Sequence, residues 1–381
     1  MKVKIYEVCE QIRGVSYKPS DVLDSLTGIP ILRANNISDG TINYDNLVYI
    51  KKERISSKQI LKKGDILICT SSGSKNLVGK AGLIEKDVLI SSFGAFCRVL
   101  RAHDISSEYL FHYFCSNAYK NRISSLSEGA NINNIRNEHI NVLEIPIYPL
   151  EEEKKLLKVL NVTKSLILRR KQQLTKLNEL AKSRFIEMFG DFPLNEKKWE
   201  TGQIRNVVYD VRYGTSLPAS LDGKYPYFRM NNITYSGELD LSEIKRINIP
   251  DREFSKYAIQ KGDVLFNRTN SKELVGKTCV YDKDDKMILA GFIIRIRVND
   301  RMLPEFLSAF LNADFSKKML LEKCKTAIGQ ANINAQELQN FDIYIPPIEL
   351  QKQFVFIKNQ LDKSKFRMKK CLKLFTYMRH L

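Results

Sequence analysis

The chain has 381 residues, of which 43% are hydrophobic, enough to bury more than one core and too many for a disordered tail. Its 61 Lys and Arg against 43 Asp and Glu give a formal net charge of +18, which favours a polyanionic partner, with nucleic acid ahead of an acidic protein or a membrane surface. No apolar run reaches the roughly 18 residues of a membrane span, and the seven cysteines form no CxxC pair, so we expect a reduced, cytoplasmic protein without a membrane partner.

The first region, residues 1–148, contains short β-rich runs bounded by Gly, Asn and Asp. These runs are residues 29–37, 65–70, 79–84 and 93–100, and a helical pattern follows at residues 107–116. The order predicts a strand-rich α+β domain whose helices come late.

A long helix is predicted next, over residues 149–191. Strong helix formers dominate it, and no glycine or proline interrupts residues 151–189. A stripe of residues spaced by alternating threes and fours is typical of a coiled coil and comprises Leu160, Thr163, Ile167, Arg170, Leu174, Leu177, Ala181, Arg184 and Met188. A helix of about 40 residues is about 60 Å long, so it is interpreted as a spacer rather than as an internal helix of a globular domain.

The region after this helix, residues 192–346, repeats landmarks of the first region about 198 residues later. Arg33-Ala34-Asn35-Asn36 returns as Arg229-Met230-Asn231-Asn232, Lys63-Gly64-Asp65 as Lys261-Gly262-Asp263, and Ala130-Asn131-Ile132-Asn133 as Ala331-Asn332-Ile333-Asn334. Landmarks in the same order indicate a duplication, in which a domain and a long helix each occur twice. Two copies predict a pseudo-twofold molecule.

A second long helix closes the chain over residues 347–381. The three–four spacing recurs there at Phe354, Ile357, Leu361, Ser364, Met368, Cys371 and Phe375. Because a whole domain separates the two helices and returns the chain, we expect them to pair as an antiparallel coiled coil. The alternative is two amphipathic helices that pack on different globular cores.

Catalytic motifs are not convincing in this sequence. Residues 271–278 come within one residue of a phosphate-binding loop, but Ser271 replaces the required glycine and the following residues resemble a strand rather than a helix. No GxGxxG motif follows a strand, and the four histidines are not spaced as metal ligands. We therefore expect a chain without catalytic residues and without a bound metal.

Polar and basic residues of the repeats are the candidates for DNA binding. Arginine and asparagine suit the edges of guanine and adenine, and hydroxyl and basic side chains suit phosphates. The Arg-x-Asn-Asn elements supply Arg33, Asn35, Asn36, Arg229, Asn231 and Asn232, and two loops with the lysines that follow them supply Thr70, Ser71, Ser72, Ser74, Lys75, Lys80, Asn267, Arg268, Thr269, Asn270, Lys272 and Lys277. Elements repeated in both halves could instead be structural, which makes the loop residues that differ between the copies the better candidates for reading sequence.

These motifs together resemble the specificity subunits of type I restriction–modification systems, over the whole chain. The resemblance is carried by the Ala-Asn-Ile-Asn element, by residues 145–154, by Ser183-Arg184-Phe185-Ile186-Glu187-Met188-Phe189-Gly190-Asp191 and by the second helix after Pro346-Pro347. It implies two target-recognition domains that each read one half of a bipartite DNA site. The second helix ends at Leu381 and is shorter than the first, which implies fewer contacts there with a partner.

The same resemblance implies the partners and cofactors of the chain. Two methyltransferase subunits would dock on the paired helices, and restriction–translocase subunits would join through the complex. The helix residues implied in spacing and docking are Leu160, Ile167, Leu174, Leu177, Met188, Phe354, Ile357, Leu361, Met368 and Phe375. S-adenosylmethionine, ATP and magnesium would be bound by the partner subunits and not by this chain.

Three other interpretations remain open at this point. The chain could be the DNA-recognition subunit of a related type II enzyme with a bipartite site. It could be a nuclease or methyltransferase in its own right. It could also be a coiled-coil scaffold without DNA specificity, whose charge only confers solubility.

Overall fold

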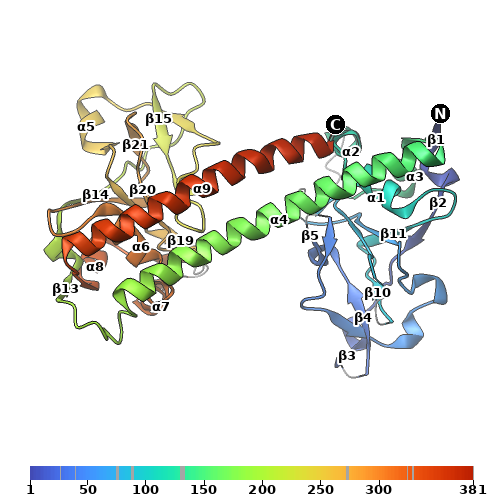
Figure 1. The fold of residues 1–381 in the computed structure, drawn as a ribbon, viewed down its shortest axis with the longest axis horizontal. Coiled ribbons are helices and arrows are strands. Elements are labelled where there is room, and N and C mark those ends of the chain that lie inside the picture. Colours follow the sequence, from blue (N-terminus) through green and yellow to red (C-terminus); the bar gives the residue numbers. More distant parts are fainter. Residues whose placement is uncertain are drawn as a thin grey trace. The chain divides into compact units, whose positions relative to one another are not determined.

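The computed structural model describes residues 1–25, 27–38, 40–73, 77–86, 90–128, 134–271, 274–323, 325–327 and 330–380. The chain divides into two compact units: unit 1 is Met1–Lys171 with Lys370–Leu381, and unit 2 is Gln172–Lys369. The two longest helices, α4 (Leu150–Phe189) and α9 (Ile348–His380), are each shared between the units (Figure 1). The domain limits expected from the sequence treat each long helix as a separate segment, whereas the limits between the two units fall within both helices.

Unit 1 contains two four-stranded sheets. The first is antiparallel in the order β2-β11-β8-β9, and the second has the order β10-β4-β7-β3 with a parallel β10–β4 pair. The strands of the two sheets are β2 (Cys9–Arg13), β11 (Cys97–Ala102), β8 (Ile66–Cys69), β9 (Ala81–Leu83), β10 (Ser92–Phe93), β4 (Ile29–Leu32), β7 (Val48–Ile50) and β3 (Val22–Leu23). The other elements are β1 (Lys2–Lys4), β5 (Ile37–Ser38), β6 (Thr41–Ile42), β12 (Glu144–Pro146), α1 (Ser107–Cys115), α2 (Asn117–Glu128) and α3 (Asn137–Asn141).

Unit 2 repeats this architecture. Its sheets have the orders β14-β22-β18-β20 and β16-β15-β21-β17, with a parallel β15–β21 pair. Their strands are β14 (Val208–Tyr213), β22 (Ile293–Val298), β18 (Val264–Asn267), β20 (Thr278–Val280), β16 (Lys245–Ile247), β15 (Tyr225–Phe228), β21 (Met287–Leu289) and β17 (Ala258–Ile259). The remaining elements are β13 (Thr201–Gln203), β19 (Thr269–Asn270), β23 (Lys325–Ala327), β24 (Gln330–Asn332), β25 (Asp342–Tyr344), α5 (Phe254–Tyr257), α6 (Pro304–Asn312), α7 (Asp314–Lys323) and α8 (Ala335–Gln339).

Short 3-10 turns link these elements. They are η1 (Ile5–Glu7), η2 (Pro19–Asp21), η3 (Ala34–Asn36), η4 (Lys52–Arg54), η5 (Ser57–Gln59), η7 (Ile204–Val207), η8 (Met230–Asn232) and η9 (Asp251–Glu253). The run at residues 29–37, read from the sequence as one strand, is interrupted by η3, because Asn36 bonds back to the chain instead of continuing the ladder. The described part of the chain is a mixed α and β protein with two similar strand-rich units, as the sequence predicted.

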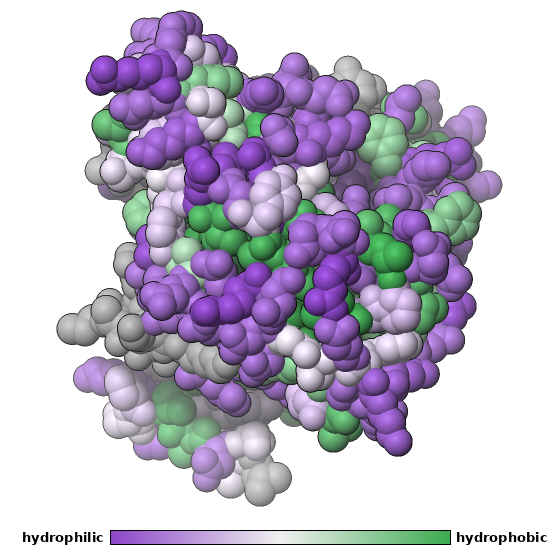
Figure 2. All heavy atoms as spheres, turned by 90° about the vertical axis from the view of Figure 1, so that its left-hand side faces the viewer, coloured by the Kyte–Doolittle hydropathy of each residue, from purple (hydrophilic) through white to green (hydrophobic). Residues whose placement is uncertain are grey.

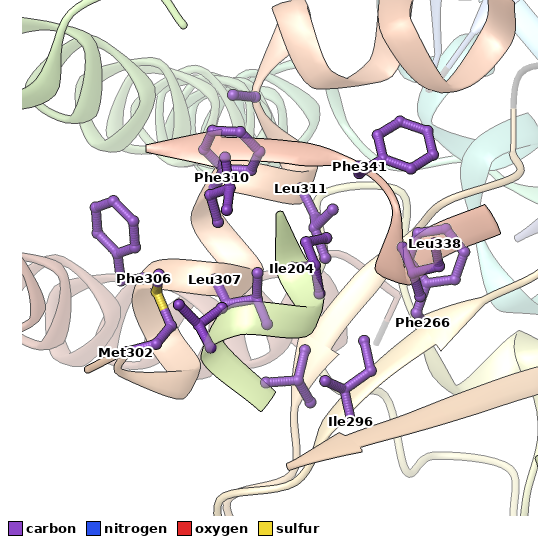
Figure 3. Packing of buried hydrophobic residues seen from close by; sticks show 14 of the residues in the cluster. Ile204, Phe266, Ile296, Met302, Phe306, Leu307, Phe310, Leu311, Leu338 and Phe341 are labelled. Carbon is purple, nitrogen blue, oxygen red and sulfur yellow. The ribbon is translucent and has the colours of Figure 1, made fainter. Parts of the chain in front are cut away.

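The inner strand β8 of the antiparallel sheet shows that the sheet of unit 1 has a hydrophobic cluster on both faces. In β8, Ile66 and Ile68 point into one hydrophobic cluster, and Leu67 and Cys69 into another. All four residues of this strand are fully buried, which fits its continuous apolar run, since an alternating polar face would be exposed on one side. Strand β18 of unit 2 repeats the arrangement. Figure 3 shows part of the larger cluster there, where Phe306 and Phe310 of α6 are among the packed residues.

One repeat landmark pairs differently in the structure from the sequence match. Thr269 of β19 is paired with Asn332, and Ser71 of unit 1 forms the corresponding bridge with Asn134. The residue after each asparagine makes an equivalent backbone hydrogen bond. Ile333 N donates to Arg268 O at 3.0 Å, and Ile135 N donates to Thr70 O at 2.7 Å. The structural counterpart of Asn332 is therefore Asn134 and not residue 131, which lies outside the described residues, so the sequence alignment at this landmark was wrong.

Helix α4 has clear start and stop signals. Glu151, Glu152 and Glu153 fill its first turn, where acidic side chains interact favourably with the helix dipole. Gly190 follows the last helical residue with a φ of 80°, a left-handed conformation that glycine adopts without steric cost, and its N–H donates to Ile186 O at 2.7 Å. The helix therefore runs over 40 residues without interruption.

Two phenylalanines anchor the end of α4 in unit 2. The rings of Phe185 and Phe189 lie 5.2 Å and 5.8 Å from that of Phe354, near the start of α9. Trp199 Nε1 also donates a hydrogen bond of 2.9 Å to Phe189 O. Within unit 2 the two long helices thus meet through aromatic packing that lies one position after the predicted stripe at residues 184 and 188.

Most residues of the predicted stripes are half-buried, although Cys371 is exposed. Ile167 and Phe354 are buried, Arg184 is exposed, and the following helix residues are half-buried: Leu160, Leu174, Leu177, Met188, Ile357, Leu361, Met368 and Phe375. In unit 1, α4 is also fixed to α1 by polar contacts, because Asn161 bonds His112 Nε2 at 2.9 Å and donates to Glu108 at 2.8 Å. Neither α4, α9 nor any other described helix combines the length and apolar character needed to cross a membrane.

Candidate nucleic-acid interface

The two Arg-x-Asn-Asn turns have the same shape, and this shape depends on their last residue. Asn36 is fully buried; its Oδ1 accepts a 2.9 Å hydrogen bond from Arg33 N, and its Nδ2 donates to Asp45 O at 2.9 Å. Asn232 is 2% exposed, and its Oδ1 accepts from Arg229 N at 2.8 Å. Because neither amide has surface to offer a base, the base-reading prediction is wrong for Asn36 and Asn232, and the structural alternative holds.

The other residues of these turns remain accessible. Asn35 and Asn231 are exposed, while Arg33 and Arg229 are half-buried. Arg33 Nη2 donates to Asn46 O at 3.0 Å. The Nε atoms of both arginines are buried and have no hydrogen-bond partner among the residues that the structure describes. Phosphate positioning therefore stays open for these four residues.

Lys277 is buried and holds turn η8 in place. Its Nζ donates to Met230 O at 3.1 Å and to Ile233 O at 2.7 Å, and burial lowers the pKa of its ammonium group. Strand β20 begins directly after it, at Thr278, rather than the helix that a phosphate-binding loop needs. The DNA-binding prediction is therefore wrong for Lys277, whereas Lys80, which follows the equivalent loop of unit 1, is exposed.

The first residues of the two polar loops are also buried. Thr70 is 3% exposed, and its Oγ1 donates to Phe96 O at 3.2 Å. Asn267 is fully buried at the end of β18, and its Nδ2 donates to Leu274 O at 3.4 Å. These side chains shape the loops from inside, so the prediction that they contact DNA is wrong for both.

In unit 2 the next residues form a polar and aromatic surface, the Arg268 cluster, composed of Tyr213, Arg268, Thr269, Phe292 and Asn332. The Arg268 guanidinium lies over the Tyr213 ring, 4.8 Å from its centroid, and Thr269 Oγ1 donates to Asn332 Oδ1 at 3.2 Å. Stacking on tyrosine holds the arginine in place while leaving its edge available for hydrogen bonding. A half-buried, positioned guanidinium beside hydroxyl and amide groups suits contacts to DNA.

The corresponding surface of unit 1, the Ser71 cluster, contains Arg13, Ser71, Phe96, Arg98 and Asn134. Arg13 and Arg98 are direct neighbours across strands β2 and β11. Like charges in such a pair repel each other. Burial and then Arg13 lower the pKa of Arg98, with Glu138 opposing them, and its buried Nε has no hydrogen-bond partner among the described residues. An anion bound at this face would relieve the repulsion.

Several predicted residues are not settled by these contacts. Ser74, Lys75 and Lys272 lie outside the described residues. Asn270 belongs to β19, but its side chain is not described, and Ser72 is half-buried in the loop that begins with Ser71. Their DNA-binding roles stay predictions.

Sequence reasoning missed Tyr213, Phe96 and Phe292. The only signal in the sequence was that a phenylalanine follows two small residues at the same place in both copies, Gly94-Ala95 and Ala290-Gly291. Over the described residues, no group of three or more His, Cys, Asp or Glu side chains is arranged to hold a metal ion. Most residues on the face drawn in Figure 2 are hydrophilic, in keeping with the charge of the chain.

Comparison with known proteins agrees with this architecture. The family described as "Type I restriction modification DNA specificity domain" matches the chain twice, at residues 1–179 and 196–373. The chain is 29% identical over 369 residues to the EcoKI specificity subunit of Escherichia coli K12 and 30% identical over 377 residues to the StySPI specificity subunit of Salmonella potsdam. Each alignment covers 92% of this chain and 79% of the relative.

Two solved structures share this fold. The S subunit of a type I system from M. genitalium superposes with a TM-score of 0.52 at 14% identity, over 100% of this chain and 93% of that one. A chain from a structure of a type I R-M system gives a TM-score of 0.50 at 18% identity, over 100% and 97% of the two chains. At such low identity these likenesses show the fold. With the two family matches, one to each copy of the repeat, the chain belongs to the type I restriction modification DNA specificity domain family.

Proposed function

We propose that this chain is the specificity subunit of a type I restriction–modification enzyme and binds a bipartite DNA sequence. The observation that carries the proposal is the duplication of one surface: each unit places hydroxyl, amide and arginine groups at the end of the same two strands. Two equivalent surfaces in one chain suit a target with two separated half-sites. The twofold match to the specificity-domain family supports this assignment.

Each of the two clusters would make both phosphate contacts and base contacts. Arginine contacts to phosphates supply affinity that falls as salt rises, and contacts to base edges supply the sequence preference. The clusters differ in composition. The buried Thr70 of unit 1 stands where unit 2 has Arg268, and Arg13 stands where unit 2 has Tyr213. Different groups at equivalent places give different half-sites.

The long helices would set the distance between the half-sites and dock the partner subunits. We propose that α4 and α9 pair along their length and that two methyltransferase subunits bind this pair, with restriction–translocase subunits joining through them. S-adenosylmethionine, ATP and magnesium then belong to those partners, and the chain itself is not catalytic. Purified chain incubated with DNA and either S-adenosylmethionine or magnesium should give no methylation and no cleavage.

Exchanging residues 1–148 for the same region of a subunit with a different target is expected to change one half-site only. The other half-site and the gap should be retained, because unit 2 and the helices are untouched. Methylation-sensitive sequencing of DNA from cells that carry the chimera with its methyltransferase measures the whole target. As a control, the reciprocal exchange of residues 192–346 should change the other half. Simultaneous change of both halves would contradict one unit per half-site.

Arg268→Ala is expected to weaken DNA binding by the assembled methyltransferase complex about 5- to 150-fold, as for an arginine that contacts a base or phosphate. Lys277→Met is the matched control. It removes a cation nine residues further along the chain, one that is buried and bonded to Met230 O and Ile233 O. We expect the control to change thermal stability and to leave the affinity within about twofold. Fluorescence anisotropy on a labelled target duplex measures the affinity of both variants, and thermal unfolding measures their stability. Equal losses in two folded variants would remove Arg268 from the interface.

A further inference from the structure

Both units display a large apolar side chain beside their polar clusters. Phe96 is 69% exposed and Phe292 is 55% exposed, although phenylalanine is among the residues most often buried. The two residues are equivalent in the fold: Phe96 O accepts from Thr70 N at 2.9 Å, and Phe292 O accepts from Arg268 N at 3.0 Å. An exposed ring at the same place in both copies is a feature of the repeat rather than an isolated surface residue.

The turns that carry these rings are tightly fixed. In unit 1, Ala95 N donates to Val15 O at 2.9 Å and Cys97 N donates to Gly94 O at 2.9 Å. A Cβ atom on Gly14 would lie only 2.1 Å from Gly94 O, so only glycine allows the two segments to approach this closely.

The turn in unit 2 has the same bonds. Gly291 N donates to Thr215 O at 2.8 Å and Ile293 N donates to Ala290 O at 3.0 Å. A Cβ atom on Gly214 would lie 2.2 Å from Leu289 O. The backbone under each phenylalanine is therefore ordered before any partner binds, which lowers the entropic cost of using the ring as a contact.

The surroundings of the rings indicate what they contact. Arg268 N donates to Phe292 O at 3.0 Å, and Ser71 N donates to Phe96 O at 3.1 Å, while the chain carries a formal net charge of +18. An apolar protein partner would have to bury these polar groups together with the ring. Nucleic acid bases instead offer flat, apolar faces and methyl groups inside a polyanion. Duplex DNA can therefore contact the ring and its polar or basic neighbours at the same time.

We infer that Phe96 and Phe292 are DNA-contacting residues whose rings enter the groove and pack against bases, each in the half-site bound by its own unit. This inference rests on the proposed function and adds an apolar contact to its polar and charged ones. The ring supplies affinity that does not depend on counterion release, because it touches no phosphate. It also places Ser71 and Arg268 at a fixed depth relative to the base edges.

The test uses the complete complex of this chain with its methyltransferase subunits and the target duplex found by methylation-sensitive sequencing. Phe96→Ala and Phe292→Ala should each weaken binding about 5- to 150-fold, with the slope of log affinity against log salt unchanged. Phe96→Leu and Phe292→Leu, which keep an apolar side chain, should recover part of the loss. Each alanine variant should lose discrimination against base changes in one half-site and keep it in the other.

Tyr209→Ala is the matched control, since Tyr209 is 69% exposed but lies at the opposite end of β14 from Tyr213, about 13 Å away. The control should bind the target as the unchanged chain does. Full affinity in both Phe→Ala complexes would overturn the inference, and so would a loss confined to complex assembly, which would make the rings a protein contact. In either case the complex with the unchanged chain would still bind its target sequence specifically. If the proposed function were wrong, the complex with the unchanged chain would show no sequence-specific binding.

Discussion

Four residues inserted into α4 between Lys171 and Gln172, and four into α9 between Lys369 and Lys370, are expected to widen the gap in the DNA target by about two base pairs. These positions are where the two units divide both helices. The insertion adds about 6 Å at 1.5 Å per residue, against about 3.4 Å per base pair of DNA. Modification of the original sequence should disappear, and modification of the wider one should replace it.

Rotation makes this experiment discriminating. Four residues turn an α-helix by about 40° beyond one full turn, whereas two residues turn it by about 200°. A two-residue insertion at the same positions should therefore abolish modification of any sequence, because it moves one unit to the far side of the duplex. Inserting four residues between Lys283 and Asp284, an exposed turn outside both helices, should leave the target unchanged. An unchanged gap after the four-residue insertion into both helices would show that they do not set the spacing.

Phe189→Ala is expected to destabilise unit 2 by about 3–5 kcal/mol, a large part of the roughly 5–15 kcal/mol that holds a typical domain together. Phe189 is fully buried, its ring lies 4.8 Å from Phe306 and 5.8 Å from Phe354, and truncation leaves a cavity between α4, α6 and α9. Thermal unfolding followed by circular dichroism measures the loss.

Ile186→Ala is the matched control for this substitution, because Ile186 stands between Phe185 and Phe189 in the sequence of α4 but is 40% exposed. We expect its cost to be about 1 kcal/mol or less. Combining Phe185→Ala with Phe189→Ala should cost less than the sum of the single changes, since the two rings are in contact at 5.1 Å and share one cavity. Equal costs for Phe189→Ala and Ile186→Ala would mean that the aromatic cluster does not anchor the helix.

The duplication could be recognised from the sequence because it rests on short, local signals. Lys-Gly-Asp precedes the central strand in both copies, and the buried aspartates, Asp65 and Asp263, bond arginines of the neighbouring strand, Arg101 at 2.8 Å and Arg297 at 2.7 Å. Gly64 and Gly262 have positive φ, and each aspartate also accepts a hydrogen bond from the backbone N–H three residues before it, so both residues recur wherever this turn recurs. At residues 130–133 the same reasoning chose the wrong register, because two Asn-Ile pairs lie close together and only strand pairing distinguishes them.

The direction of individual side chains was decided by packing. Lys277 carries the charge expected of a DNA contact but points inward, because Met230 O in η8 and Ile233 O directly after it accept hydrogen bonds from its ammonium group. Asn36 and Asn232 have the chemistry of base readers but complete the hydrogen bonds of their own turns. Local sequence gives the functional group and its approximate place, and only the assembled fold gives the partner.

By itself the sequence determined the α+β class, the two copies, the two long helices and the polyanion preference, since each follows from composition, spacing or repetition along the chain. The tertiary structure decided which polar residues are buried, that Phe185 and Phe189 rather than the heptad positions beside them anchor α4, and that Phe96 and Phe292 face outward. Whether a side chain is covered depends on segments that are distant in the chain, such as the η8 region over Lys277 and Phe306 beside Phe185. Spacing between neighbours carries no record of those contacts.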